Sequence, residues 1–211
     1  MARTKSRFVC QECGYVASSW LGRCPECGGW NTLVEEAEVT AKASKSYLPA
    51  NNEKLRPRTI ASVAQTKVER LATGIREFDR VLGGGVVQGS LVLLGGTPGI
   101  GKSTILLDAG LRFGQQGIKV LYVSGEESEE QTAMRAVRLG GAQANDNLLI
   151  LTATDLDAIL AQANALKPQL LIIDSIQTMY NPELQTAAGS VGQVRECTAK
   201  LLQFAKSTGI A

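Results

Sequence analysis

The segment LVLLGGTPGIGKST, residues 91–104, decides the fold of this chain. It carries the phosphate-loop spacing G-x4-G-K-[ST] between an apolar run that fits a buried strand and a stretch of helical length. Glycines let backbone N–H groups curl around a polyphosphate, and the next helix adds the positive end of its dipole. We predict that Lys102 reaches the β- and γ-phosphates of ATP or ADP and that the Ser103 hydroxyl binds Mg²⁺. The predicted nucleotide-binding residues are Gly96, Thr97, Pro98, Gly99, Ile100, Gly101, Lys102, Ser103 and Thr104.

Short apolar runs alternate with amphipathic stretches of helical length on both sides of this loop. The predicted strands are Leu91–Gly95, Val120–Ser124, Leu148–Thr152 and Leu170–Asp174. The predicted helices are Lys102–Gln116, Glu129–Leu139, Asp155–Leu166 and Gly189–Lys206. This alternation indicates βαβ units, and therefore an α/β fold in which a parallel sheet has helices on both faces.

Two carboxylates are predicted to complete the nucleotide site. The strand LLIID ends in Asp174, the Walker B pattern, which would place a carboxylate beside Mg²⁺. The alternative is an aspartate that only caps the next element. Glu126 follows the strand VLYVS and would lie at the carboxyl edge of the sheet, where α/β proteins bind ligands. We favour Glu126 as the group that orients the attacking water because it is closer to the strand end than Glu127. Two alternatives stay open: Glu127 has this role, or the acidic residues only form a solvated start of the next helix.

Two polar residues downstream are candidates for further contacts. Gln177 could sense the γ-phosphate or contact the following segment, and a plain surface glutamine is the alternative. The stretch 179–192 is long and rich in small residues, and loops of that length inside compact domains are often functional. Arg195 at the start of the next helix could contact a phosphate or form an ordinary surface salt bridge.

Four of the five cysteines form two CxxC pairs near the N-terminus. Each pair puts two sulfurs on a tight turn, and four thiolates close a tetrahedral Zn²⁺ site that has no open position for catalysis. About 30 residues cannot bury enough core alone, so the metal would supply the folding energy. Two disulfides or a redox CxxC fit less well, and Cys197 is expected to be an inert core thiol. The predicted zinc ligands are Cys10, Cys13, Cys24 and Cys27.

The composition is globular and excludes several classes of protein. The chain has 211 residues, a formal net charge of +2, 44% hydrophobic residues and no histidine. Without histidine, Ser-His-Asp, Cys-His and histidine-ligated metal chemistry are excluded. The near-zero net charge means that nucleic-acid binding must come from local patches. No apolar run is long enough to span a membrane and no secretion signal begins the chain, so we expect a cytoplasmic protein.

The residue composition and the apolar pattern change twice along the chain. Residues 1–34 carry the cysteine pairs and four of the ten aromatic residues, as in a small zinc finger. Residues 35–58 are polar and charge-mixed without apolar periodicity, which predicts a flexible linker. Residues 59–211 hold the regular apolar pattern and are predicted to form the nucleotide-binding domain, incomplete at its C-terminus because the chain ends where a further core strand is expected.

Taken together, these motifs resemble the bacterial RadA/Sms DNA repair family, whose core is similar to the RecA and KaiC group of ATPases. The resemblance rests on GRCPECGGWNT (22–32), on TGIREFDRVLGGGVVQGSLVLLGGTPGIGKST (73–104), on YVSGEES (122–128) and on LLIIDSIQTMYNPELQTAAGSVGQVREC (170–197). It implies a zinc-finger, RecA-like, DNA-dependent ATPase in recombinational repair, one that processes branched intermediates and promotes branch migration. The resemblance also implies hexameric rings of the complete protein, single-stranded and branched DNA as partners, and a recombinase partner.

Carried over by motif, the resemblance assigns catalytic roles to Lys102, Glu126 and Asp174, and places Gln177 and Arg195 in a DNA-binding stretch. Thr97 stands where the family usually has aspartate, and its side chain should point away from the phosphates. A KNRFG motif and a Lon-protease-like domain of the family are not present in these 211 residues. An alternative is therefore a zinc-finger module that binds nucleotide and a partner without turnover.

Overall fold

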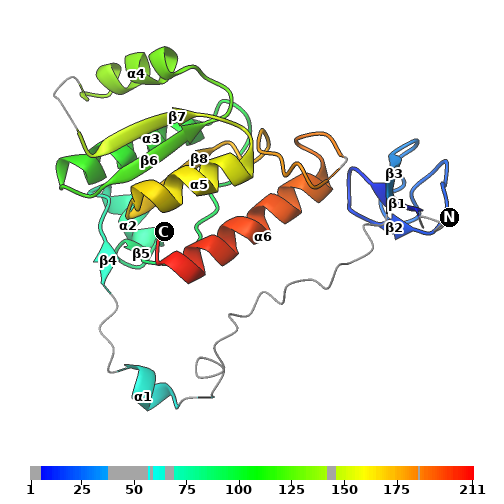
Figure 1. The fold of residues 1–211 in the computed structure, drawn as a ribbon, viewed down its shortest axis with the longest axis horizontal. Coiled ribbons are helices and arrows are strands. Elements are labelled where there is room, and N and C mark those ends of the chain that lie inside the picture. Colours follow the sequence, from blue (N-terminus) through cyan, green and yellow to red (C-terminus); the bar gives the residue numbers. More distant parts are fainter. Residues whose placement is uncertain (1–5, 38–56, 58, 65–68, 142–145, 185) are drawn as a thin grey trace.

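A computed structural model describes residues 6–37, 57, 59–64, 69–141, 146–184 and 186–211. Its centre is a parallel three-stranded sheet with the strand order β7-β6-β8 (Figure 1). The strands are β6 (Val120–Ser124), β7 (Leu148–Thr152) and β8 (Leu170–Asp174). All three coincide with predicted strands, so the α/β class and the parallel sheet are confirmed. Most of the predicted linker, residues 38–56 and 58, lies outside the described residues.

Helices cover both faces of this sheet (Figure 1). Val120 and Tyr122 of β6 pack in an apolar cluster with α3 and α4, whereas Leu121 and Val123 pack in a second cluster with α5 and α6. Successive side chains of a strand point to opposite faces, so a strand that is apolar throughout is covered twice. The four helices lie close to their predicted bounds and are α3 (Lys102–Gln115), α4 (Glu129–Arg138), α5 (Leu156–Leu166) and α6 (Val191–Thr208).

Side-chain caps determine where three of these helices begin. The Ser128 hydroxyl accepts a hydrogen bond from the Gln131 N–H in a full capping box at the start of α4. The Asp155 carboxylate accepts hydrogen bonds from the first turn of α5, and the Ser190 hydroxyl accepts one from the first turn of α6. These caps satisfy N–H groups that would otherwise lack a partner in the first turn, and they fix the loops that reach the carboxyl edge of the sheet.

The strand predicted at Leu91–Gly95 is not formed. Val92 and Leu93 are 46% and 74% exposed, and within the described residues no strand pairs with this segment. On the outer edge of β8, Ala211 donates a hydrogen bond to the Gln169 carbonyl and accepts one from the Leu171 N–H. An apolar run becomes a strand only beside a hydrogen-bonded neighbour, and within the described residues no strand lies beside this run.

Smaller elements precede the glycine-rich loop and were not predicted. They are α1 (Ile60–Ala64), β4 (Arg70–Leu71), α2 (Arg76–Val81) and β5 (Val86–Val87), with β4 and β5 antiparallel. The Asp79 carboxylate accepts hydrogen bonds from the N–H groups of Thr73 and Gly74, which fixes the turn before α2. None of the helices in the described part of the chain has the length and apolar character that a membrane span requires.

The N-terminal unit is a small antiparallel sheet of order β2-β1-β3. Its strands are β1 (Ser6–Cys10), β2 (Val16–Ala17) and β3 (Leu33–Ala37). Two equivalent turns carry the cysteine pairs. The Gly14 N–H donates to the Cys10 carbonyl, and the Gly28 N–H donates to the Cys24 carbonyl, each at 2.9 Å. Both glycines have a positive φ, 77° at Gly14 and 75° at Gly28, which residues with side chains strongly disfavour.

Candidate nucleotide site and metal centre

The glycine-rich loop 96–104 includes the first turn of α3, and the start of the loop lies against the Lys102 side chain of that turn. Gly99 and Gly101 have φ values of 76° and 101°, so the loop takes a path that residues with side chains rarely follow. Lys102 Nζ donates to the carbonyls of Gly96 and Thr97 at 2.8 and 2.9 Å. The predicted phosphate-binding lysine therefore lies across the loop, at the N-terminus of a 14-residue helix, where backbone N–H groups favour an anion.

The next residue of α3 meets the end of β8. Ser103 Oγ donates a hydrogen bond to Asp174 Oδ1 at 3.1 Å, although the two residues are 71 positions apart in the sequence. A hydroxyl and a carboxylate are the hard oxygen donors that Mg²⁺ prefers, so this pair fits the predicted cation. The second oxygen, Asp174 Oδ2, accepts a hydrogen bond of 2.6 Å from the Tyr122 hydroxyl. Burial and this hydrogen bond raise the pKa of Tyr122 well above its ordinary value, so the phenol is a donor at neutral pH.

The two candidate glutamates at the end of β6 are in different situations. Glu126 is exposed, and its Oε1 accepts a hydrogen bond of 2.8 Å from the Ser175 hydroxyl. Glu127 forms an ion pair with Arg135 of α4, and its backbone N–H donates to the Ser124 hydroxyl at 3.0 Å. Glu126 thus lies beside the end of β8 and is open to water, whereas Glu127 holds α4 against the sheet.

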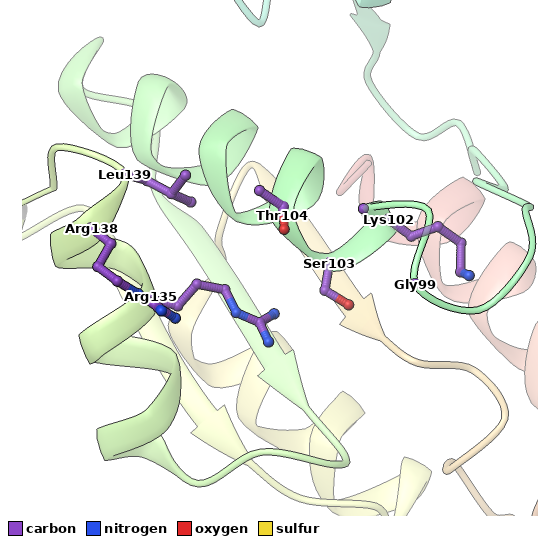
Figure 2. A pocket seen from close by; sticks show the side chains of 8 residues that line it. Gly99, Lys102, Ser103, Thr104, Arg135, Arg138 and Leu139 are labelled. Atoms are coloured by element: carbon purple, nitrogen blue, oxygen red, sulfur yellow. The ribbon is translucent and has the colours of Figure 1, made fainter.

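A cavity of about 440 Å³ lies between the glycine-rich loop and the C-terminal half of α4 (Figure 2). Its volume is within the range of small-molecule sites in proteins. Arg135 and Arg138 extend from α4 toward the cavity, opposite Ser103 and Thr104. Sequence reasoning missed these arginines, yet their i,i+3 spacing on a helix that follows the candidate glutamates was a usable signal. The residues around the cavity are Gly99, Gly101, Lys102, Ser103, Thr104, Arg135, Arg138 and Leu139.

The two candidate DNA contacts are exposed but are not brought together by any hydrogen bond. Gln177 lies in the turn that follows β8. Arg195 lies on α6, where its guanidinium is 3.6 Å from the carboxylate of Glu196. Between them, the buried Gln193 side chain accepts from the Asn181 N–H and donates to the carbonyls of Asn181 and Thr186. One glutamine of α6 therefore holds much of the small-residue-rich loop in place.

The four predicted zinc ligands converge in the N-terminal unit. Their sulfur atoms all lie within 4.8 Å of one another. The Cys10–Cys27 and Cys13–Cys24 sulfur pairs are each 3.6 Å apart, and all four thiols are free. Tetrahedral Zn²⁺ with Zn–S bonds of about 2.3 Å separates its sulfurs by about 3.8 Å. The donor set therefore fits one closed structural zinc ion, and four free thiols at these separations match that site better than two disulfides.

The surroundings of these thiols differ. The hydroxyl of Thr32 lies 3.2 Å from Cys10 Sγ, and this hydrogen bond lowers the pKa of Cys10 to about 6. For Cys27 the Gly29 N–H favours the thiolate, but burial and the neighbouring sulfurs outweigh it and raise the pKa to about 12. The neighbouring thiols therefore favour the thiolate of Cys10 and disfavour that of Cys27, whereas a bound divalent cation would favour the thiolate form of all four.

Known proteins match both units of the chain. A family model described as "Rubredoxin metal binding domain" matches residues 8–35, and one described as "AAA domain" matches residues 51–211. The whole chain is 49% identical to "DNA repair protein RadA" of Halalkalibacterium halodurans, 47% identical to that of Bacillus subtilis, and 49% identical to that of Streptococcus pyogenes serotype M1. In each case the chain spans 46% of the length of the relative it matches.

The parallel sheet, the glycine-rich loop and the four-cysteine cluster define an α/β nucleotide-binding type of protein with a zinc ribbon in front. The family match extends over most of the chain, and the chain belongs to the AAA domain family. Over its full length it is similar to the N-terminal portion of the RadA proteins, which confirms the resemblance found in the sequence.

Proposed function

We propose that the chain is the ATP-binding and ATP-hydrolysing part of a DNA-dependent ATPase that acts in recombinational repair on the nucleoid. The observation that carries this proposal is the 3.1 Å hydrogen bond between Ser103 and Asp174. It joins the end of the glycine-rich loop to the end of β8, so the predicted cation ligands share one edge of the sheet. Glu126 lies at the same edge, through its hydrogen bond to Ser175.

Phosphate binding would use groups that the loop already presents. Lys102 is bonded to the Gly96 and Thr97 carbonyls, and the greater negative charge of a triphosphate would draw its ammonium group to the β- and γ-oxygens. The first N–H groups of α3 would receive the remaining phosphate oxygens. Ser103 and Asp174 would hold Mg²⁺, which when bound neutralises charge that develops on those oxygens.

Hydrolysis needs a group that orients the attacking water. Glu126 is exposed at the carboxyl end of β6, and a carboxylate held by one hydrogen bond retains lone pairs for a water molecule. Ser175 keeps this carboxylate close to Asp174. Glu127 is engaged with Arg135, so its part in the site is to hold α4, whose Arg138 adds positive charge beside the nucleotide.

The DNA half of the proposal is supported by the relatives and by the exposure of two side chains. The matched relatives are named DNA repair proteins. We place single-stranded and branched DNA along Gln177 and Arg195, both exposed beyond the end of β8. Branch migration, a hexameric ring in the complete protein and a recombinase partner belong to the same proposal, and so does work in the cytoplasm.

The test is ATP turnover by the chain with and without single-stranded DNA, together with nucleotide binding. We expect Lys102→Ala to lose Mg²⁺-dependent nucleotide binding, because the loop then lacks its cation. We expect Glu126→Gln to bind nucleotide normally and to lose turnover by about 10²- to 10⁴-fold.

Glu127→Gln is the matched control and should lose less turnover than Glu126→Gln. DNA affinity should fall as salt rises, because phosphate contacts release counterions. Unchanged nucleotide affinity in Lys102→Ala would refute the nucleotide site. Binding without turnover, with or without DNA, would instead support a nucleotide-binding zinc-ribbon module.

A further inference from the structure

The hydroxyl of Tyr122 is a polar group on β6, the central and fully buried strand of the parallel sheet. Tyr122 lies at the middle of β6, opposite Ile172 of β8, and only 1% of its surface is exposed. It is the largest fully buried side chain in the described part of the chain. Its ring packs with Leu107 and Phe113 in the cluster under α3 and α4. Phenylalanine would fill the same volume, so packing accounts for the ring and leaves the hydroxyl unexplained.

The hydroxyl of Tyr122 donates its hydrogen bond to the carboxylate of Asp174. Its hydrogen bond of 2.6 Å to Oδ2 comes from a ring that its neighbours hold on all sides, so the donor is fixed in space. The other oxygen, Oδ1, faces Ser103 Oγ at 3.1 Å. One oxygen of the carboxylate is therefore anchored in the interior, and the other is presented to the end of the glycine-rich loop. Rotation of the carboxylate would break a buried, charge-assisted hydrogen bond.

We propose that Tyr122 is a positioning residue for the divalent cation: its hydroxyl locks the Asp174 carboxylate so that one oxygen stays aimed at the position shared with Ser103. The inference rests on the proposed function, since it requires nucleotide binding that depends on Mg²⁺. It goes further by giving a role to a buried strand residue that is neither in the glycine-rich loop nor among the predicted cation ligands.

Loss of this hydroxyl has a specific consequence. In Tyr122→Phe the carboxylate keeps its charge but can turn, and Oδ2 loses its donor. Cation binding then has to order a ligand that the native chain holds in advance, which weakens the affinity for the cation. Nucleotide binding without a divalent cation does not use Asp174 and stays unchanged.

The experiment follows fluorescent mant-ADP binding to the chain while Mg²⁺ is titrated, with a parallel measurement in EDTA. We expect the half-saturating Mg²⁺ concentration to rise about fivefold to tenfold in Tyr122→Phe. The mant-ADP affinity in EDTA should equal that of the native chain. Electron paramagnetic resonance with Mn²⁺ counts the bound ion directly and should show the same shift without any turnover.

Three further variants separate positioning from simple stability. Tyr180→Phe removes a tyrosine hydroxyl that makes no hydrogen bond within the described residues, and should leave the Mg²⁺ midpoint unchanged. Replacement of Tyr122 by p-aminophenylalanine restores an N–H donor, and should rescue the midpoint even if the phenylalanine variant does not fold. Adding Tyr122→Phe to Asp174→Asn should cause no further shift, because the two residues act through one contact.

An unchanged Mg²⁺ midpoint in folded Tyr122→Phe, or no rescue by the amino analogue, overturns the role of Tyr122. If the native chain itself shows no Mg²⁺-dependent nucleotide binding, the proposed function has failed instead. The two failures are therefore distinguishable in one set of titrations.

Discussion

The zinc ribbon and the nucleotide-binding domain are stabilised by different physical means. The buried cluster of the ribbon has four members, Cys10, Ala17, Cys24 and Leu33, and two of these are predicted zinc ligands. The nucleotide-binding domain instead buries apolar side chains on both faces of its sheet, and its polar site lies at one edge. A fold whose stability depends on one ion unfolds when that ion is lost. A fold with two apolar layers stays folded when residues of its chemical site are substituted.

The largest expected effect breaks the ribbon alone. Chelation of zinc, or Cys24→Ser, should unfold the ribbon, because zinc binding contributes on the order of 10 kcal/mol to such small domains. The nucleotide-binding domain should keep its melting transition. Zinc content and the NMR signals of residues 6–37 measure the first effect, and differential scanning calorimetry measures the second.

Cys197→Ala is the matched control for the ribbon variant. Cys197 is fully buried in the cluster under α5 and α6, where burial raises the pKa of its thiol. Its removal should cost some stability of the nucleotide-binding domain and no zinc. Ribbon signals that persist without metal would contradict the contrast between the two regions.

The second prediction concerns a substitution that destabilises the nucleotide-binding domain and leaves the ribbon folded. Ile159 of α5 has none of its surface exposed and packs against β6, so Ile159→Ala should cost about 2–5 kcal/mol of unfolding free energy. Ile60 of α1 is 87% exposed, and the same substitution there should cost far less. Urea unfolding followed by far-UV circular dichroism gives both values. Loss of zinc in Ile159→Ala would show that the two regions depend on each other for folding.

A third change is directed at the chemical site and should leave both folds intact. Ser175→Ala removes the hydrogen bond of 2.8 Å that holds Glu126. Given the proposed function, we expect turnover to fall about tenfold, equivalent to about 1.4 kcal/mol, with nucleotide affinity unchanged. Ser207→Ala, an exposed serine of α6, is the control. Equal turnover in the two variants would remove Ser175 from the site.

Much of this architecture follows from local sequence pattern, because buried strands and amphipathic helices leave clear periodicities. Strands β6, β7 and β8 have the bounds that their apolar runs predict. Leu91–Gly95 has an equally apolar run but no strand, because pairing is a property of the neighbour and cannot be read from the run itself. The sulfur cluster was predictable from spacing, since CxxC turns leave few other geometries.

The residues of the candidate site were predictable only where a sequence motif specifies the role of each of its residues. Lys102, Ser103 and Asp174 come from such motifs. The contacts of Tyr122 and Ser175 were not predicted. From sequence alone, a tyrosine within a buried strand is expected to be a core residue, and a serine after a strand is expected to be a turn residue. Their roles emerge only once the strands are placed side by side in register. Arg138 faces the cavity for the same reason, through the packing of α4.

The smallest expected effect concerns a charge cluster that joins α6 to the rest of its domain. Lys200 Nζ lies 3.1 Å from Asp157 Oδ1, 3.2 Å from Glu183 Oε2 and 3.0 Å from Asn181 Oδ1. The hydrogen bond and charge of Lys200 lower the pKa of Glu183 below its ordinary 4.5. Burial works against the charged form of Lys200, but its carboxylate partners outweigh burial and raise its pKa above 10.5.

Lys200→Met should therefore cost stability in a defined range of pH. A lowered carboxyl pKa contributes stability above pH 4.5, and this is lost as pH falls through the folded-state value. A raised lysine pKa contributes stability below pH 10.5, and this is lost as pH rises through the folded-state value. Between these limits we expect a cost of about 1 kcal/mol or less, because Glu183 and Asp157 are largely solvated. Urea unfolding at about pH 7 and about pH 3 measures the loss of unfolding free energy in Lys200→Met, which should become smaller in acid. Lys206→Met changes an exposed lysine of the same helix and should change the unfolding free energy little at either pH. A difference that stays constant between the two pH values would mean that Lys200 acts through the packing of its methylene groups and not through its charge.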